Sequence, residues 1–115
     1  MTPLPPKFFE GIKLFNQEEF YDCHEVLEDV WKDQLNPEKQ LTQGIIQVAV
    51  ALYHSRRDNF VGAEKLLVRG EARIRQSLEI ATPIDVASLL SHVGQALHSV
   101  QRKELPANFS IKNKN

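Results

Sequence analysis

The 115-residue sequence lacks the features that mark secreted and membrane proteins. It has one cysteine, Cys23, so no intramolecular disulfide can form, and a reducing, cytoplasmic setting is expected. The longest apolar run, IIQVAVALY, is far shorter than the roughly 20 residues that cross a bilayer. No basic segment followed by an apolar one opens the chain, which predicts no secretory signal. The sequence therefore predicts a small cytoplasmic protein without a membrane partner.

An excess of charge of either sign is also missing. The chain has 14 Lys and Arg against 15 Asp and Glu, for a net charge of −1, so no nucleic-acid partner is expected. Hydrophobic residues make up 42% and charged residues 25%, an ordinary globular balance. The length suits one core, which predicts a single domain over residues 1–115.

Strand-like alternation of polar and apolar residues is absent, whereas apolar residues recur at helical spacing in five segments. These segments predict helices over residues 7–15, 18–34, 37–57, 60–80 and 86–100. Residues 1–6 hold three prolines and should be extended. The polar residues from about 105 to 115 should form a loose tail, in which Phe109 and Ile111 could still dock. Short turns between the helices predict an all-α fold, a compact bundle of antiparallel helices.

A weak internal repeat leaves a second arrangement open. The segment EEFYDCHEVLEDVW, residues 18–31, aligns with DNFVGAEKLLVRGE, residues 58–71, at an offset of 40 residues. Repeated helix pairs are typical of stacked helical hairpins of the tetratricopeptide kind. The five helices are therefore predicted to form either a simple bundle or two stacked hairpins.

Unusual polar residues lie on the inner face of the second predicted helix. A helical wheel places His24 within the apolar arc, Glu28 at its edge and Trp31, the only tryptophan, close by. Glu25 follows His24 in sequence but points well away from it. Only Glu28, one turn on, can meet His24 on the same face.

The third predicted helix is apolar all round except for one polar stripe. Gln43, Gln47 and His54 recur at i, i+4 and i+11, and Tyr53 offers a phenol hydroxyl beside them. A buried polar group without a partner costs roughly 1–3 kcal/mol, so the residues of this stripe need hydrogen-bonding partners on a neighbouring element. We expect it to face the His24–Glu28 edge across a narrow cleft.

Two imidazoles and one carboxylate form a common ligand set for a divalent metal with an open coordination position. His24, Glu28 and His54 are therefore predicted to bind one ion, such as Zn, Mn, Fe or Ni, with Glu25 or Gln47 in support. An open-site water would make the protein a metal-dependent hydrolase. His-x-x-x-Glu differs from the His-Glu-x-x-His motif of zinc proteases, so no protease is indicated.

Two other interpretations stay open. The polar cluster can be a buried structural network inside a helical-repeat module that binds proteins, or Trp31 can wall a small-molecule pocket. Whether the protein is an enzyme is left undecided by the sequence. A homodimer is the default expectation for the assembly.

Three segments together resemble a known family: FNQEEFYDCHEVLEDVW, QGIIQVAVALYH and NFVGAEKLL. They resemble a bacterial and archaeal family known as domain of unknown function 309, whose hallmark is His-x-x-x-Glu-x-x-Trp, here His24, Glu28 and Trp31. The resemblance covers roughly residues 8–70, and Cys23 stands where the family usually has alanine. It implies an all-helical fold and a motif suspected of binding metal, and it implies no established activity.

Overall fold

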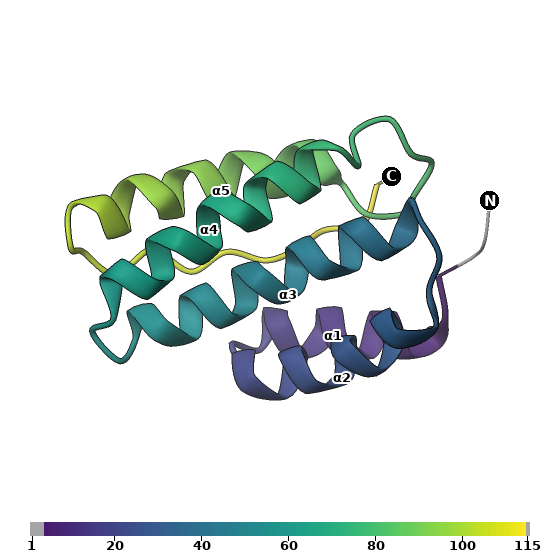
Figure 1. Cartoon of the computed structure of the whole chain (residues 1–115), viewed down its shortest axis with the longest axis horizontal. Coiled ribbons are helices and arrows are strands. Elements are labelled where there is room, and N and C mark those ends of the chain that lie inside the picture. The colour runs from purple at the N-terminus through teal and green to yellow at the C-terminus, as the bar shows by residue number, and fades with distance from the viewer. Residues whose placement is uncertain (1–3, 115) are drawn as a thin grey trace.

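The structure is a computed structural model and describes residues 4–114. Its elements are α1 (Pro6–Asn16), α2 (Phe20–Asp33), α3 (Glu38–Ser55), α4 (Phe60–Arg75) and α5 (Val86–Gln101), shown in Figure 1. Within residues 4–114 the only β-type pairing is an isolated bridge between Ile84 and Asn113. The predicted all-α class and the number of helices are confirmed. No helix among these residues is long and apolar enough to cross a membrane.

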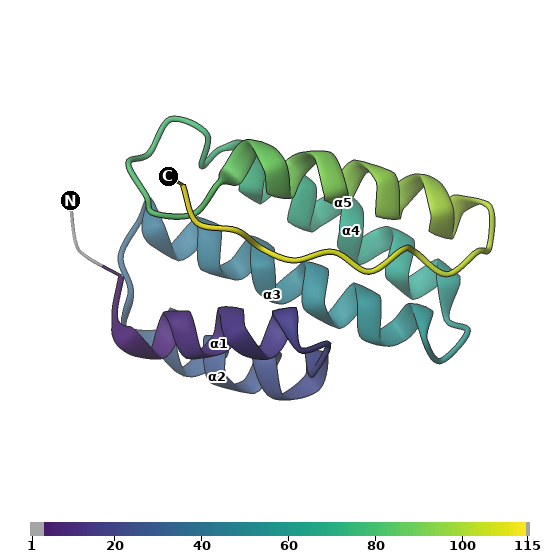
Figure 2. The same ribbon diagram turned by 180° about the vertical axis from the view of Figure 1, so that it is seen from behind.

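Helices that follow one another in the sequence pack against one another in space. α3 is central: α1 and α2 lie on one side of it, and α4 and α5 lie on the other (Figures 1 and 2). The most extensive packing joins α3 to α4. The all-α bundle is therefore built by sequential stacking of antiparallel helices, whereas kinship with tetratricopeptide repeats stays a prediction.

Two side-chain caps fix where the later helices begin. The Asn59 side chain accepts a hydrogen bond from Gly62 N at 3.0 Å, and Asp85 accepts one from Ser88 N at 3.0 Å. Asp85 is therefore the N-cap residue of α5, and just before it the Thr82 hydroxyl accepts a hydrogen bond from Ile84 N at 3.3 Å.

Two glycines let the backbones of α3 and α4 approach closely. A Cβ atom on Gly44 would lie 2.6 Å from Ile74 Cγ1, and one on Gly70 would lie 3.0 Å from the Gly44 carbonyl oxygen. Around this contact α3 buries apolar side chains, including Leu41, Ile45, Val48, Ala49 and Leu52. The two glycines therefore fix how closely α3 lies against α4.

The C-terminal segment differs from the expected loose tail. Residues 104–114 run back along the molecule between α1 and α5, across α3 (Figure 2). Ile111 is buried, and Phe109 lies 5.5 Å from Phe15, ring centroid to ring centroid. The tail is docked because these two apolar side chains add to the core, although its sequence is mostly polar. Of the predicted extended start, residues 1–3 lie outside the described residues, and Pro6 already begins α1.

Candidate functional site

One face of α2 presents its polar residues to α3, while its opposite face belongs to the core. Cys23, Leu27 and Val30 are buried on the core face. On the other face, Tyr21 lies 5.8 Å from Tyr53 of α3, ring centroid to ring centroid. His24, Glu28 and Trp31 follow Tyr21 at helical spacing. The helical wheel places His24 within the apolar arc and Glu28 at its edge, and the two side chains are 23% and 55% exposed.

His24 and Glu28 form a hydrogen-bonded pair, with His24 Nε2 lying 3.0 Å from Glu28 Oε1. A carboxylate oxygen accepts hydrogen bonds, so this geometry places a proton on Nε2 and leaves Nδ1 as the other ring nitrogen. This Nδ1 atom is buried and has no hydrogen-bond partner. Glu28 therefore acts on His24 by fixing its tautomer and its orientation.

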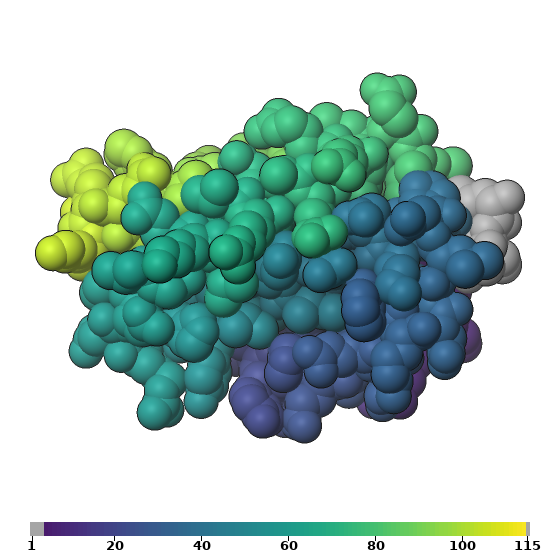
Figure 3. All heavy atoms as spheres, in the orientation of Figure 1, coloured from purple at the N-terminus to yellow at the C-terminus, as the bar shows by residue number. Residues whose placement is uncertain are grey.

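A groove of about 540 Å³ lies between α2 and α3. The face drawn in Figure 3 is hollowed where side chains of these two helices meet. We call it the α2–α3 groove; its lining residues are Glu25, Glu28, Asp29, Trp31, Lys32, Gln43, Ile46 and Gln47. The groove brings together five predicted site residues: Glu25, Glu28, Trp31, Gln43 and Gln47. Asp29, Lys32 and Ile46 were not predicted, although Asp29 and Lys32 lie one turn after Glu25 and Glu28.

Two buried polar atoms without partners belong to residues that line this groove. Trp31 Nε1 and Gln47 Oε1 form no hydrogen bond with the rest of residues 4–114. His24 Nδ1 and side-chain atoms of Gln34 and Thr42 are also buried without partners, but these residues do not line the groove. Each unpaired buried group costs roughly 1–3 kcal/mol. The two atoms in the groove are therefore a reason to expect a polar ligand or ordered water there.

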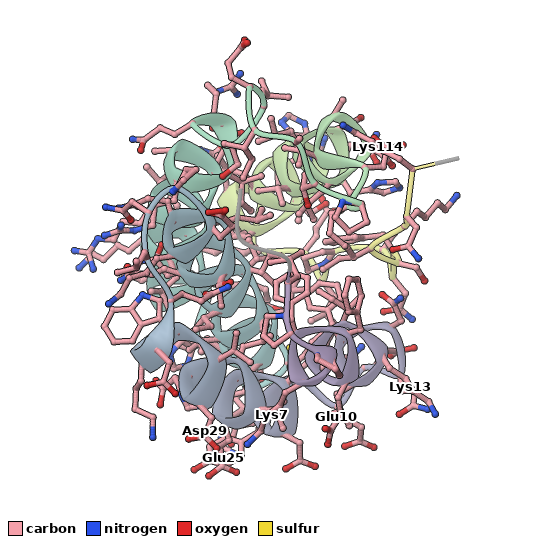
Figure 4. All side chains as sticks on the ribbon, turned by 90° about the vertical axis from the view of Figure 1, so that its right-hand side faces the viewer. Lys7, Glu10, Lys13, Glu25, Asp29 and Lys114 are labelled. Carbon is pink, nitrogen blue, oxygen red and sulfur yellow. The ribbon has the colours of Figure 1, made fainter. Side chains whose placement is uncertain are left out.

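The charges at the rim of the groove are unevenly balanced. Asp29 Oδ2 lies 2.9 Å from Lys7 Nζ, and its Oδ1 lies 2.9 Å from Lys32 Nζ. Hydrogen bonds from Lys7 and then Lys32 hold the pKa of Asp29 at about 2. Figure 4 shows Glu25 beside Asp29 at the lower edge of α2. Within residues 4–114 neither Glu25 nor Glu28 forms an ion pair with lysine or arginine, so the groove keeps two carboxylates without a cationic partner.

His54 does not complete the predicted metal site. Among residues 4–114, no three His, Cys, Asp or Glu side chains come close enough to hold an ion. The His54 ring instead lies 6.2 Å from Tyr53, beyond the end of the groove. His24 and Glu28 supply two donors where catalytic zinc sites have three protein ligands. The residues present do not fit the three-ligand site, and metal binding stays a prediction.

Tyr53, predicted as a cleft residue, joins an aromatic cluster with Tyr21 next to the groove. Tyr21 lies 5.6 Å from the His24 ring, and the Arg57 guanidinium lies 5.5 Å from the Tyr53 ring centroid. Tyr21 is half exposed. The spacing of Tyr21 and His24 on α2 could have indicated this cluster, because i and i+3 residues are neighbours on a helix.

The stacked helices and the groove define an all-α protein with a polar, groove-like site between its second and third helices. A family model described as Domain of unknown function (DUF309) matches residues 8–66, slightly more than half of the chain. The chain belongs to this family. The match covers most of α1, all of α2 and α3 and the first part of α4, and so includes the whole α2–α3 groove.

The chain is also similar to a protein of Bacillus subtilis (strain 168) named "Uncharacterized protein YpuF". The two are 48% identical over 50 residues. This stretch covers 43% of the chain and 29% of the relative, so the chain matches less than a third of the relative's length. The similarity supports the family and carries no activity with it.

Proposed function

We propose that the protein binds a small cationic ligand in the α2–α3 groove. The observation that carries this proposal is the set of acceptors in the groove: Gln47 Oε1, which is buried without a hydrogen-bond partner, and the carboxylates of Glu25 and Glu28, which form no ion pair with lysine or arginine within residues 4–114. Natural proteins keep such atoms where a ligand or water completes their hydrogen bonds. The groove volume of about 540 Å³ suits a small molecule.

The chemistry of the lining supports an ammonium or guanidinium ligand. Glu25 and Glu28 offer carboxylates, and Gln47 Oε1 offers an acceptor. The indole of Trp31 already accepts one cation, because Lys39 Nζ lies 4.3 Å from the ring centroid. A ligand that carries a positive charge and N–H donors would satisfy these acceptors, and a dicarboxylate would be repelled.

Trp31 provides the test, because it is the chain's only tryptophan and lines the groove. We expect 1,4-diaminobutane and agmatine to change its fluorescence saturably, while glutarate at matched ionic strength does not. Gln47→Leu should weaken this response, whereas Gln95→Leu, the same substitution on the exposed side of α5, should not. Equal responses to the cations and to glutarate, or no saturable response to either cation, would overturn the proposal.

Metal-dependent hydrolysis is the second candidate, and the His24–Glu28 pair favours it. His24 Nε2 and Glu28 Oε1, 3.0 Å apart, would be two ligands of the metal ion if Nε2 released the proton that it donates to Oε1, and a third protein ligand would still be needed. Calorimetry on protein purified without chelator should then detect binding of Zn, Mn, Fe or Ni that His24→Ala removes. Absence of micromolar binding of all four ions would refute this candidate.

A protein-interaction module is the remaining alternative from the sequence. In that case the polar cluster only stabilises the fold, and a captured partner would still bind after His24→Ala and His54→Ala. Loss of partner binding in either folded variant would contradict this alternative, because it would place the cluster in the binding surface.

A further inference from the structure

A second surface, on the opposite side of α3, already holds an extended peptide, namely the chain's own C-terminal segment (Figure 2). Two side chains anchor this segment. Phe109 stacks on His92 at 5.0 Å with an interplanar angle of 16°, and Ile111 is 3% exposed. Most other side chains of residues 104–114 are exposed, and Leu105 is 61% exposed. The segment is therefore recognised through a Phe-x-Ile pattern.

The backbone of the segment is held by a side-chain amide. Asn16 Nδ2 donates to the Ile111 carbonyl oxygen at 3.0 Å, and Ile111 N donates to Asn16 Oδ1 at 2.7 Å. Further along, Asp85 N donates to the Lys112 carbonyl at 2.8 Å. Contacts to the backbone give affinity for any extended chain, while pockets for alternate side chains give specificity, as in known peptide-binding proteins.

The segment does not fill its groove. One hollow of about 360 Å³ lies beside residues 105–109, and another of about 340 Å³ lies beside Ile111 and Asn113. The segment is joined to α5 through a short turn in which Lys103 has a φ of 58°. It could therefore leave its groove when this turn opens, without a change in the five helices.

We propose that this surface, which we call the tail groove, exchanges its own C-terminal segment for that of a second copy of the chain. The second copy's segment fits because it has the same Phe109, Ile111 and backbone as the one already bound. Exchange of an identical element between protomers needs no new interface, only an opened connection. The Asn16 amide would hold the incoming backbone as it holds the chain's own.

Complementary full-length variants test the exchange. The acceptor variant, F109A/I111A, keeps the tail groove but lacks the two side chains that anchor the segment. The donor variant, N16A, keeps these two side chains but lacks the amide that holds the segment's backbone. We expect a 1:1 mixture to sediment as a heterodimer while each variant alone stays monomeric. The matched control is an acceptor that also carries N16A, and it should not pair with the donor.

A labelled peptide of residues 104–115 gives a second measurement. It should bind the acceptor at least about 100-fold more tightly than the same peptide with both anchors changed to alanine. A folded acceptor that binds neither donor nor peptide at about 1 mM, the effective concentration of a short linker, would overturn the proposal. Peptide binding without a heterodimer would also overturn it, in favour of a segment from another protein.

If the acceptor does not fold, the unchanged sequence can be used with a protease site inserted between Lys103 and Glu104. After cleavage the wild-type segment should stay bound and then exchange with labelled peptide. A cleaved segment that does not exchange would contradict the proposal. None of these measurements depends on the α2–α3 groove, so the outcome is independent of the proposed cation binding.

Discussion

Replacing Gln47 by leucine should stabilise the protein while weakening its proposed ligand binding. The Gln47 Oε1 atom is buried without a hydrogen-bond partner, and leucine has a similar volume without a polar atom. Removing an unpaired buried acceptor recovers part of a penalty of roughly 1–3 kcal/mol. We therefore expect the free energy of unfolding to rise by about 1 kcal/mol, and the melting temperature by about 4 °C.

Urea denaturation, followed by far-ultraviolet circular dichroism, measures this change directly. Gln95→Leu is the matched control, because Gln95 is exposed on α5 and its replacement should change the free energy by less than about 0.5 kcal/mol. Equal denaturant slopes for the three proteins would show that only stability has changed. A gain in stability joined to a loss of cation binding would identify Gln47 as a residue kept for binding.

The opposite sign would refute this reasoning. If Gln47→Leu lowers the free energy of unfolding by more than about 1 kcal/mol, the amide is part of a satisfied structural network. The cluster would then be explained by folding alone, and its polar atoms would indicate no ligand.

Three further predictions concern packing and titration. Gly44→Ala should destabilise the protein by about 1–3 kcal/mol, because the new Cβ would lie 2.6 Å from an α4 side chain. Gly94→Ala should instead stabilise the protein by about 0.5–1 kcal/mol, because the nearest atom to its Cβ would be 3.9 Å away. Lys7→Met should raise the pKa of Asp29 from about 2 toward 3.8, measured by NMR titration. Burial raises the pKa of Cys23 to about 12, so the folded protein should not react with thiol reagents at neutral pH.

Each of these predictions has a clear contrary result. Equal melting temperatures for the two glycine variants would show that α3 and α4 can separate at little cost. An unchanged Asp29 titration would mean that Lys32 alone holds the carboxylate. The low pKa of Asp29 also makes the stability of the protein depend on pH. The ion pairs of Asp29 stabilise the fold above pH 3.8, and this contribution is lost as the pH falls through about 2. Rapid labelling of Cys23 would indicate that the core opens locally.

The helices and the groove were accessible from the sequence because both depend on short-range periodicity. The spacing of His24, Glu28 and Trp31 determines which face of one helix they share, and the same holds for Gln43 and Gln47. Since the two helices are consecutive and joined by a short turn, their polar stripes were expected to meet. Five of the predicted residues do line one groove.

The position of His54 was not accessible in the same way. A helical wheel gives the direction of a side chain but not its height along the neighbouring helix. His54 lies seven residues beyond Gln47, or about 10 Å along α3, because each residue adds about 1.5 Å. The docking of the tail was left open for a related reason, since Phe109 and Ile111 find their partners far away in the sequence.

The hydrogen bonds between Asn16 and Ile111 join residues 95 positions apart, almost the full length of the chain. Contacts of such long sequence separation require the largest loop to close, so they form late in folding, after the local helical pairs. We therefore expect docking of the C-terminal segment to be the last step of folding. A chain whose last residues are removed or fused to another protein should still form its helices while losing the contact that ties its two ends together.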